Sequence, residues 1–234
     1  MNNQQNQPQP QIRLNKFLAQ SIGISRREAD DLIASGKILT DDKPAVLGQR
    51  IDKNAKVCYN GKIIPFEEAG KFLYVALNKP VGYVCSKKKQ GDAPTIYELL
   101  PENLRRLKTV GRLDKNSSGL IILTNDGNFA FSMTHPKFFK TKIYEVELDR
   151  GLEPLHQQMI ADFGVEIGDG ISKLGLTKLN DERTKFEVTM SEGRNRQIRR
   201  TFAALGYDVI KLHRKQFGKY VLNDLKPGEY LLLQ

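Results

Sequence analysis

The chain has 234 residues, enough for one or two domains with a sizeable buried core. It carries 37 Lys and Arg against 27 Asp and Glu, a net charge of +10, which favours a polyanionic partner because each phosphate contact releases counterions. No apolar run approaches the roughly 20 residues of a membrane span, and no signal peptide precedes the fold. We therefore expect a cytoplasmic protein that does not bind membranes.

The cysteines and histidines are not arranged as metal ligands. Cys58 and Cys85 lack metal-type spacing, and His135, His156 and His213 are scattered. The sequence also contains no nucleotide-binding fingerprint. We therefore expect neither a metal ion nor a cofactor.

Composition and periodicity divide the chain into four parts. Residues 1–10 are rich in Gln, Asn and Pro without periodicity, which predicts a disordered tail. Residues 11–60 read as a small module of helices and short strands, and residues 61–71 as a linker. Residues 72–234 then form the larger domain, and the predicted fold class is α+β.

The small module contains a strong helix-start signal at Ser25. Ser25 and Glu28 have the spacing of a capping box. Arg26 and Arg27 occupy the first turn of this helix, where the helix dipole disfavours cations, so an incoming phosphate would stabilise them. The alternative is a simple ion pair between Arg26 and Asp30, four residues later.

The larger domain alternates apolar strands with short helices. In the strand Ile143–Leu148, Tyr144 shares a face with Val146 and Leu148, which is more typical of a core residue than of a catalytic one. Further strands are predicted at 72–78, 120–123, 186–190, 209–212 and 220–222, and helices at 96–100, 128–133, 153–163 and 194–205.

The segment 109–127 has a polar loop between apolar runs. Arg112 and Asp114 lie two residues apart where a strand enters this loop, and loops held by strands are frequent sites of chemistry. By spacing alone, an Asp that starts a turn and a solvated Arg would be an ordinary pair.

The predicted helix 194–205 has a basic face. Arg196, Arg199 and Arg200 lie within about 100° of arc, and the apolar residues lie opposite. Residues 183–219 hold ten Lys and Arg against three Asp and Glu. A basic face without acids, together with Arg194, indicates recognition of phosphate or carboxylate.

Five motifs resemble one enzyme family in order and spacing. They are LNKPVGYVCS (77–86), GRLDKNSSGLIILTNDG (111–127), KIYEVEL (142–148), SEGRNRQIRRTFAALG (191–206) and LKPGEY (225–230). Together they resemble the rRNA pseudouridine synthases of the small-subunit and large-subunit uridine branch (the RsuA type). Residues 13–38 resemble the S4 RNA-binding module. One departure is the run 39–44, which lacks the module's Asn-Gly or Asp-Gly turn, so we expect that turn to be reshaped.

The resemblance implies a site, a fold and a reaction. Asp114 would be the catalytic carboxylate, Arg199 its basic partner, Tyr144 the residue beside the uracil, and Arg112 the residue that helps to extrude the nucleotide. Asp114 would act either as a nucleophile at C1′ or as a base at C2′. The implied fold is an S4-like domain followed by a mixed, mostly antiparallel sheet.

RNA contacts are expected from both domains. The candidate RNA-binding residues are Arg13, Lys16, Arg26, Arg27, Arg112, Arg194, Arg196 and Arg200. The expected partner is ribosomal RNA in an assembly intermediate, and the expected oligomeric state is a monomer.

The target within ribosomal RNA is open to two readings. The motifs 111–127 and 193–200 lead us to expect the large-subunit (23S) RNA, with the small-subunit (16S) RNA as the alternative. A non-catalytic RNA-binding assembly factor would explain the charge but not the co-occurrence of the motifs. A glycosidase is disfavoured, since it usually needs two opposed carboxylates.

Overall fold

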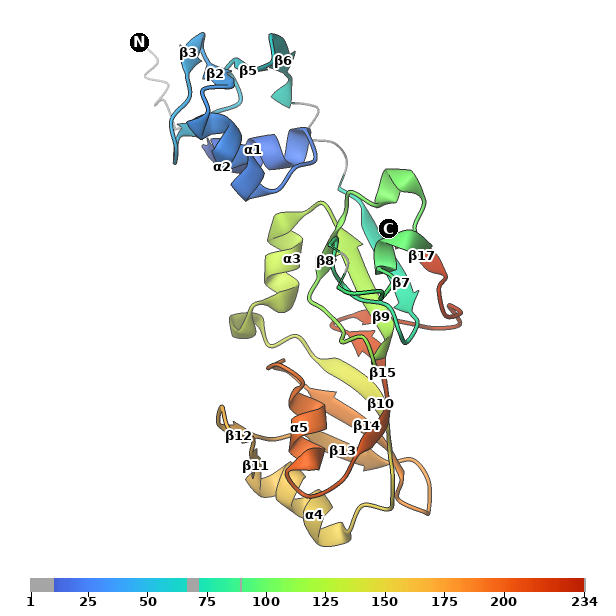
Figure 1. Cartoon of the computed structure of the whole chain (residues 1–234). Helices are drawn as coiled ribbons and strands as arrows, with labels where there is room; N and C mark the ends of the chain where they lie inside the picture. The colour runs from blue at the N-terminus through green and yellow to red at the C-terminus, as the bar shows by residue number, and fades with distance from the viewer. Residues whose placement is uncertain (1–10, 67–71, 89, 234) are drawn as a thin grey trace, which may run out of the picture. The chain divides into compact units, whose positions relative to one another are not determined.

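The structure is a computed structural model that describes residues 11–66, 72–88 and 90–233. The chain divides into two compact units between Phe72 and Leu73, and each is coloured by position along the chain in Figure 1. The tail predicted for residues 1–10 and residues 67–71 of the predicted linker lie outside the described residues.

Two helices form one side of the first unit. Helices α1 (Leu14–Ser21) and α2 (Arg26–Ala34) share a hydrophobic core with the strands of this unit. The predicted capping box of α2 is confirmed: the Glu28 N–H donates to the Ser25 hydroxyl at 3.1 Å, and the Ser25 N–H donates to the Glu28 carboxylate at 2.6 Å. This pair satisfies two of the backbone donors that a helix start leaves unbonded.

A tight turn in this unit departs from the sequence-based expectation. Strands β2 (Ile38–Thr40) and β3 (Lys43–Pro44) are joined by Asp41 and Asp42, whose φ angles are 48° and 62°. We expected the segment 39–44 to be reshaped. The two-residue turn is instead retained, because aspartate tolerates the left-handed backbone that such hairpins require.

The sheet of the first unit extends into the segment that we expected to be a linker. Strand β6 pairs with β5, and the Phe66 ring stacks on Phe17 with centroids 4.4 Å apart. The strands of this unit are β1 (Ile12–Arg13), β2 (Ile38–Thr40), β3 (Lys43–Pro44), β4 (Arg50–Ile51), β5 (Val57–Tyr59) and β6 (Lys62–Ile64).

One mixed sheet forms the centre of the second unit. Its main path runs β13-β14-β10-β15-β9-β7-β17, with β16 on β15 and β8 on β9. Among the described strands of this sheet, neighbouring pairs are antiparallel except β15 with β9, which is parallel. The strands are β7 (Tyr74–Lys79), β8 (Lys108–Val110), β9 (Ser118–Thr124), β10 (Lys142–Leu148), β13 (Gly175–Lys178), β14 (Lys185–Met190), β15 (Val209–Phe217), β16 (Tyr220–Val221) and β17 (Tyr230–Leu233), and a separate hairpin consists of β11 (Val165–Glu166) and β12 (Ile171–Ser172).

Strand β9 is buried on both of its faces. Ile121 and Leu123 pack into the larger core cluster, whereas Leu120 and Ile122 pack into a second cluster with Met133. Since successive side chains point to opposite faces of a strand, a continuous apolar run is what a doubly covered strand needs.

Short helices cover the sheet, with α3 beside β8 and with α4 and α5 toward β10, β14 and β13 in Figure 1. The helical elements are η2 (Ile96–Leu99), η3 (Glu102–Leu104), α3 (Gly127–Thr134), η4 (Pro136–Phe138), α4 (Pro154–Gln158), η5 (Met159–Phe163) and α5 (Gln197–Ala203). No helix in the described ranges is both long and apolar enough to cross a membrane.

The helix predicted at 194–205 is shorter than expected. Helix α5 begins only at Gln197, and Arg196 before it has a left-handed φ of 47°. Arg194 and Arg196 therefore do not share a helical face with Arg199 and Arg200, which corrects the predicted basic face.

The two halves of the sheet meet at one glycine. Gly119 on β9 is the register partner of Arg214 on β15 and has a φ of 102°. A Cβ at this position would lie 2.3 Å from the Arg214 carbonyl oxygen and 2.6 Å from its backbone nitrogen. Only glycine allows the two backbones to approach so closely.

We expect Gly119→Ala to destabilise the second unit by roughly 3 kcal/mol or more, since the strained φ and the backbone clash both oppose the β9–β15 pairing. Urea unfolding followed by circular dichroism measures the effect. The control is Gly127→Ala at the start of α3, where a Cβ meets no atom within 4 Å. That variant should stay within about 1 kcal/mol of wild type; equal stability of the two variants would contradict the packing argument.

Candidate active site

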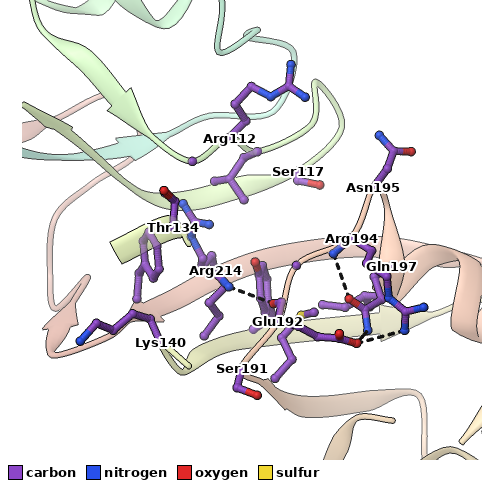
Figure 2. Close-up of a pocket in the computed structure, with 18 of the residues that line it drawn as sticks. Arg112, Ser117, Thr134, Lys140, Ser191, Glu192, Arg194, Asn195, Gln197 and Arg214 are labelled. Carbon is purple, nitrogen blue, oxygen red and sulfur yellow. Dashed lines mark hydrogen bonds and ion pairs between the residues drawn. The ribbon is translucent and has the colours of Figure 1, made fainter. Parts of the chain in front are cut away.

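A cavity of about 400 Å³ opens on the second unit. Four segments line it: the loop before β9, the stretch from the end of α3 into β10, the turn from β14 into α5, and strand β15. Figure 2 shows polar side chains from these segments, among them Arg112, Lys140, Glu192 and Arg214.

The sheet register explains why distant segments meet here. Arg214 on β15 pairs with Tyr144 on β10 on one side and with Gly119 on β9 on the other. The loop that contains Asp114 leads directly into β9. Asp114, Tyr144 and Arg214 therefore line one cavity although a hundred residues separate the first from the last.

The loop after Asp114 is fixed by donors to three consecutive carbonyl groups. The buried Lys79 ammonium donates to the Ser117 carbonyl at 2.6 Å and more weakly to that of Lys115 at 3.4 Å. The Gly82 N–H also donates to the Lys115 carbonyl, at 2.8 Å, and Arg199 donates to the Asn116 carbonyl at 2.8 Å. Backbone polarity of this loop is thus satisfied from three directions, which makes the loop rigid.

The charge of Asp114 also affects the pKa of the buried Lys79. Burial lowers the pKa of Lys79 to about 8, and the charges of Cys85 and Asp114 oppose that shift. The sequence analysis did not single out Lys79. A lysine directly after an apolar strand and before Pro80 was the available signal.

The Asp114 carboxylate, unlike the backbone of its loop, has no hydrogen-bond donor among the described residues. Asp114 is half-buried, yet within the described residues no donor bonds to its carboxylate and no ion pair joins it to Arg199. Arg199 instead donates to the carbonyls of Val209 and Asn116. Burial and the neighbouring Arg196 lower the pKa of Arg199, whereas Asp114 raises it, so the carboxylate lies within electrostatic reach. The expected ion pair between Asp114 and Arg199 is therefore absent from the described residues. Arg199 instead binds the backbone of the Asp114 loop.

Tyr144 and Arg214 form the floor of the cavity beside each other. Tyr144 is 8% exposed and Arg214 only 2%. The Arg214 Nε donates to the Leu120 carbonyl at 2.7 Å, and its guanidinium lies 4.9 Å from the centre of the Phe217 ring. Its buried Nη2 has no hydrogen-bond partner in the described part of the chain. A buried donor without a partner is costly, so this group is a candidate for a ligand contact.

The sequence analysis missed Arg214 because the predicted strand stopped at Leu212. The signal was present: an arginine stands between Leu212 and Phe217, both of which are buried positions of β15. A charged residue at an inward position of a strand is rarely buried without a task.

Lys142 is a second cation that the sequence analysis did not single out. Its ammonium donates to the Glu192 carbonyl at 2.9 Å and lies 5.5 Å from the Phe217 ring centre. Burial and the charge of Arg214 lower the pKa of Lys142 to about 8, although Glu192 opposes the shift. Lys142 thus lines the cavity with a pKa well below that of an ordinary lysine.

The predicted RNA-binding arginines of this unit fall into two groups. Arg194 pairs with Asp169 at 3.2 Å and with Glu192 at 3.0 Å, and Arg200 pairs with Asp169 at 2.7 Å. These pairs tie the β11–β12 hairpin to α5, and the hydrogen bond from Arg200 lowers the pKa of Asp169. We expected a basic face without acids. Asp169 lies beside Arg194 and Arg200, so that expectation was wrong for these two arginines.

Arg112 and Arg196 form the other group. Both are exposed and line the cavity, and no ion pair engages either of them among the residues that the structure describes. Figure 2 shows the Arg112 side chain pointing away from Arg214 and Glu192, toward the outside of the cavity.

The predicted cations of the first unit gather at the starts of its two helices. Arg26 donates to the Asn15 side chain at 3.3 Å, and Asn15 donates to Asp30 at 2.8 Å. Arg26 therefore does not pair with Asp30 directly. Asn15 lies between Arg13 and Lys16 at the start of α1, and Arg26 and Arg27 begin α2, so the bond from Arg26 to Asn15 links the starts of the two helices.

A profile of the family described as "RNA pseudouridylate synthase" matches residues 73–204, which include the Asp114 loop, Tyr144 and α5. The chain belongs to the RNA pseudouridylate synthase family. It is therefore an isomerase, as the five motifs predicted. A crystal structure of a pseudouridylate synthase is 32% identical and superposes with a TM-score of 0.68 over 95% of this chain and 96% of that one. The similarity confirms the predicted α+β fold.

Named relatives extend the similarity over nearly the whole chain. The ribosomal small subunit pseudouridine synthase A of Pasteurella multocida is 36% identical over 94% of each chain. The ribosomal large subunit pseudouridine synthase B of Bacillus subtilis is 31% identical over 93% of this chain and 90% of its own. The dual-specificity RNA pseudouridine synthase RluF of Escherichia coli is 34% identical over 95% of this chain and 76% of its own.

For a pseudouridine synthase, the titration of Lys142 gives a testable pH dependence. A lysine loses its charge as the pH rises through its pKa, so binding of single-stranded RNA should weaken between pH 7 and pH 9. Over the same range, the slope of log affinity against log salt should lose about 0.7, the share of one phosphate contact. Fluorescence anisotropy at several salt concentrations measures both quantities.

The matched control is Lys142→Arg, because a guanidinium stays charged over this range. That variant should keep its affinity and salt slope from pH 7 to pH 9. A wild-type slope that does not change with pH would show that Lys142 does not contact phosphate.

Proposed function

We propose that this chain converts a uridine of ribosomal RNA to pseudouridine, with Asp114 as the catalytic carboxylate. One observation carries the proposal: Asp114 lines a cation-rich cavity, while Lys79 and Arg199 bind the backbone of its loop and leave the carboxylate available. A half-buried carboxylate in such a place is a candidate for covalent or base catalysis.

The charge of the cavity suits a nucleotide. Its Lys and Arg residues outnumber its acids, Asp114 and Glu192, and they are Arg112, Lys140, Lys142, Arg194, Arg196 and Arg214. A lining of this kind favours the binding of phosphate groups. A volume near 400 Å³ is in the usual range for a small bound group.

The reaction requires little beyond binding and one carboxylate. The N1–C1′ bond breaks, the base turns, and C5 joins C1′, while C5 loses a proton and N1 gains one. Asp114 would either attack C1′ or remove the C2′ proton. Neither route changes the composition of the RNA or needs an external reagent.

The other residues of the cavity would hold the base. The Tyr144 ring would pack on the uracil, and the Arg214 Nη2 would donate to a uracil carbonyl oxygen. Arg112, exposed at the rim, would help to take the nucleotide out of its stack, a step that costs a few kcal/mol in a duplex and less in a loop.

The first unit would supply affinity rather than chemistry. Arg13, Lys16, Arg26 and Arg27 lie at or beside the first residues of its two helices, where backbone N–H groups and side chains can both meet phosphate. A second binding unit on the same chain raises the effective concentration of the RNA at the catalytic unit. We propose an assembly intermediate as the substrate and a monomer as the active form.

The small ribosomal subunit is the proposed source of the target uridine. Our sequence analysis favoured the large subunit. The named small-subunit relative is 36% identical and the large-subunit relative 31%, and further small-subunit enzymes are 35% and 33% identical. These relatives support the alternative reading better than the original one.

Asp114→Asn should abolish turnover and leave RNA binding nearly intact, because the amide keeps the shape but loses the charge. The test incubates the enzyme with unmodified small-subunit and large-subunit rRNA, free and as assembly intermediates. Carbodiimide-dependent primer extension then maps pseudouridine. The control is Asp181→Asn, which alters a 99% exposed carboxylate.

A single new stop in one RNA, absent with Asp114→Asn and present with Asp181→Asn, is the expected result. An active Asp114→Asn variant would remove Asp114 from the mechanism. Tight binding without a stop in any RNA would favour a non-catalytic assembly factor.

Arg199→Ala should lower kcat by about 100-fold with a smaller change in KM, because displacement of a catalytic group by about 1 Å has that effect. The variant leaves the Asn116 and Val209 carbonyls without their donor. Arg105→Ala is the control, since Arg105 also donates to a backbone carbonyl, but to that of Leu100, which lies outside the Asp114 loop. A normal kcat in Arg199→Ala would show that Lys79 and Gly82 alone hold the loop.

A further inference from the structure

Three exposed phenylalanines stand next to the cavity and have no role in the reaction described above. Phe131, Phe138 and Phe139 are 47%, 38% and 73% exposed; Phe131 lies on α3, and the other two lie between α3 and β10. Thr134, His135, Pro136 and Lys140 from the same stretch line the cavity. The aromatic residues are therefore continuous with its rim.

The rings pack on one another outside the core. The Phe131 ring lies 4.6 Å from that of His135 and 5.8 Å from that of Phe138. The Lys137 ammonium lies 5.3 Å from the centre of the Phe131 ring and 4.8 Å from that of Phe138. Mutual contacts of this kind hold aromatic rings in place while they remain exposed to a ligand.

The backbone at Phe139 is left-handed and ends η4, where the Phe139 N–H donates to the Pro136 carbonyl at 3.1 Å. Its φ is 45°, in the left-handed region that favours Gly or Asn, and its side chain is 73% exposed. A bulky residue in this conformation is unusual and costs stability. The turn that ends η4 needs the backbone conformation but not a phenyl ring, so the exposed ring is available to a ligand.

The charge around the rings fits RNA. From Gly127 to Tyr144 the sequence contains Lys137, Lys140 and Lys142 but no Asp or Glu. Aromatic faces beside cations bind single-stranded nucleic acid, because bases stack on the rings while the cations meet the phosphates. Lys140 and Lys142 also line the cavity, so one strand of RNA could contact both places.

We propose that Phe131, His135, Phe138 and Phe139, here named the aromatic rim, form a stacking subsite for a nucleobase adjacent to the target uridine. The proposal rests on the proposed function, since it takes the RNA strand at the cavity as given. The aromatic rim binds an unpaired neighbour of the extruded uridine and offsets part of the stacking that extrusion removes.

The test uses short single-stranded RNAs that contain one uridine with 2-aminopurine on its 5′ or its 3′ side. Stacking on a protein ring quenches this fluorophore. The variants are Phe138→Ala, Phe139→Ala and Phe139→Tyr. The matched control is Phe163→Ala, which removes a 69% exposed phenylalanine from η5, outside the cavity lining.

Wild type should quench the fluorescence from one side of the uridine. Phe138→Ala and Phe139→Ala should lose this quenching and bind RNA about tenfold more weakly, as expected for loss of one stacked base. With an unmodified target RNA as the substrate, the KM of these two variants should rise while their kcat changes little. Phe139→Tyr should restore both readouts, and Phe163→Ala should match wild type. Thermal unfolding of each variant checks that the fold is unchanged.

If Phe138→Ala and Phe139→Ala remain active with unchanged quenching and KM, the proposed stacking subsite is wrong. The proposed reaction would then still stand. An equal loss in Phe163→Ala would reduce the effect to non-specific contact and overturn the subsite as well. Binding to anionic phospholipid vesicles that the same variants lose, with RNA binding unchanged, would assign the surface to a membrane instead. If the quenching depends on the aromatic rim but the protein modifies no RNA, the stacking subsite is supported and only the proposed reaction is wrong.

Discussion

The close approach of β9 and β15 at Gly119 is the constraint on which the site depends. This parallel pair joins two antiparallel halves of the sheet, and its backbones come so near that a methyl group has no space. As a result, the Asp114 loop at the start of β9 faces the Arg214 strand and, beyond it, Tyr144 on β10. Long-range strand pairing thus builds a cavity whose proposed catalytic residues come from separate segments of the chain.

The cations around Asp114 act on the peptide groups of its loop. Lys79 and Arg199 donate to the carbonyls of residues 115–117, so the loop is held without neutralising the carboxylate. A direct ion pair would also orient Asp114, but it would occupy the oxygen atoms that a ribose must reach. Rigid support from the backbone and an available functional group are what preorganised sites require.

Charge counts along the chain do not separate structural cations from those that can meet RNA. Arg194 and Arg200 are engaged by Asp169 from a distant hairpin, whereas Arg112 and Arg196 are exposed at the cavity. Arg214 is almost fully buried and yet has one donor without a partner in the described chain. The difference lies in the neighbours that folding supplies, because an arginine whose guanidinium is already paired with a carboxylate is less available for phosphate.

The sequence by itself determined the family, the α+β class, the capping box of α2 and the doubly buried strand β9, since local patterns and ordered motifs encode these features. It also identified Asp114, Tyr144 and Arg199 as candidates, although their catalytic roles rest on the proposed function. Only the tertiary structure decided that α5 begins at Gln197, that Arg199 holds the loop through Asn116, and that Lys79, Lys142 and Arg214 join the site. The physical reason is that these features arise from contacts between residues far apart in the chain, and the register of β9, β15 and β10 sets those contacts.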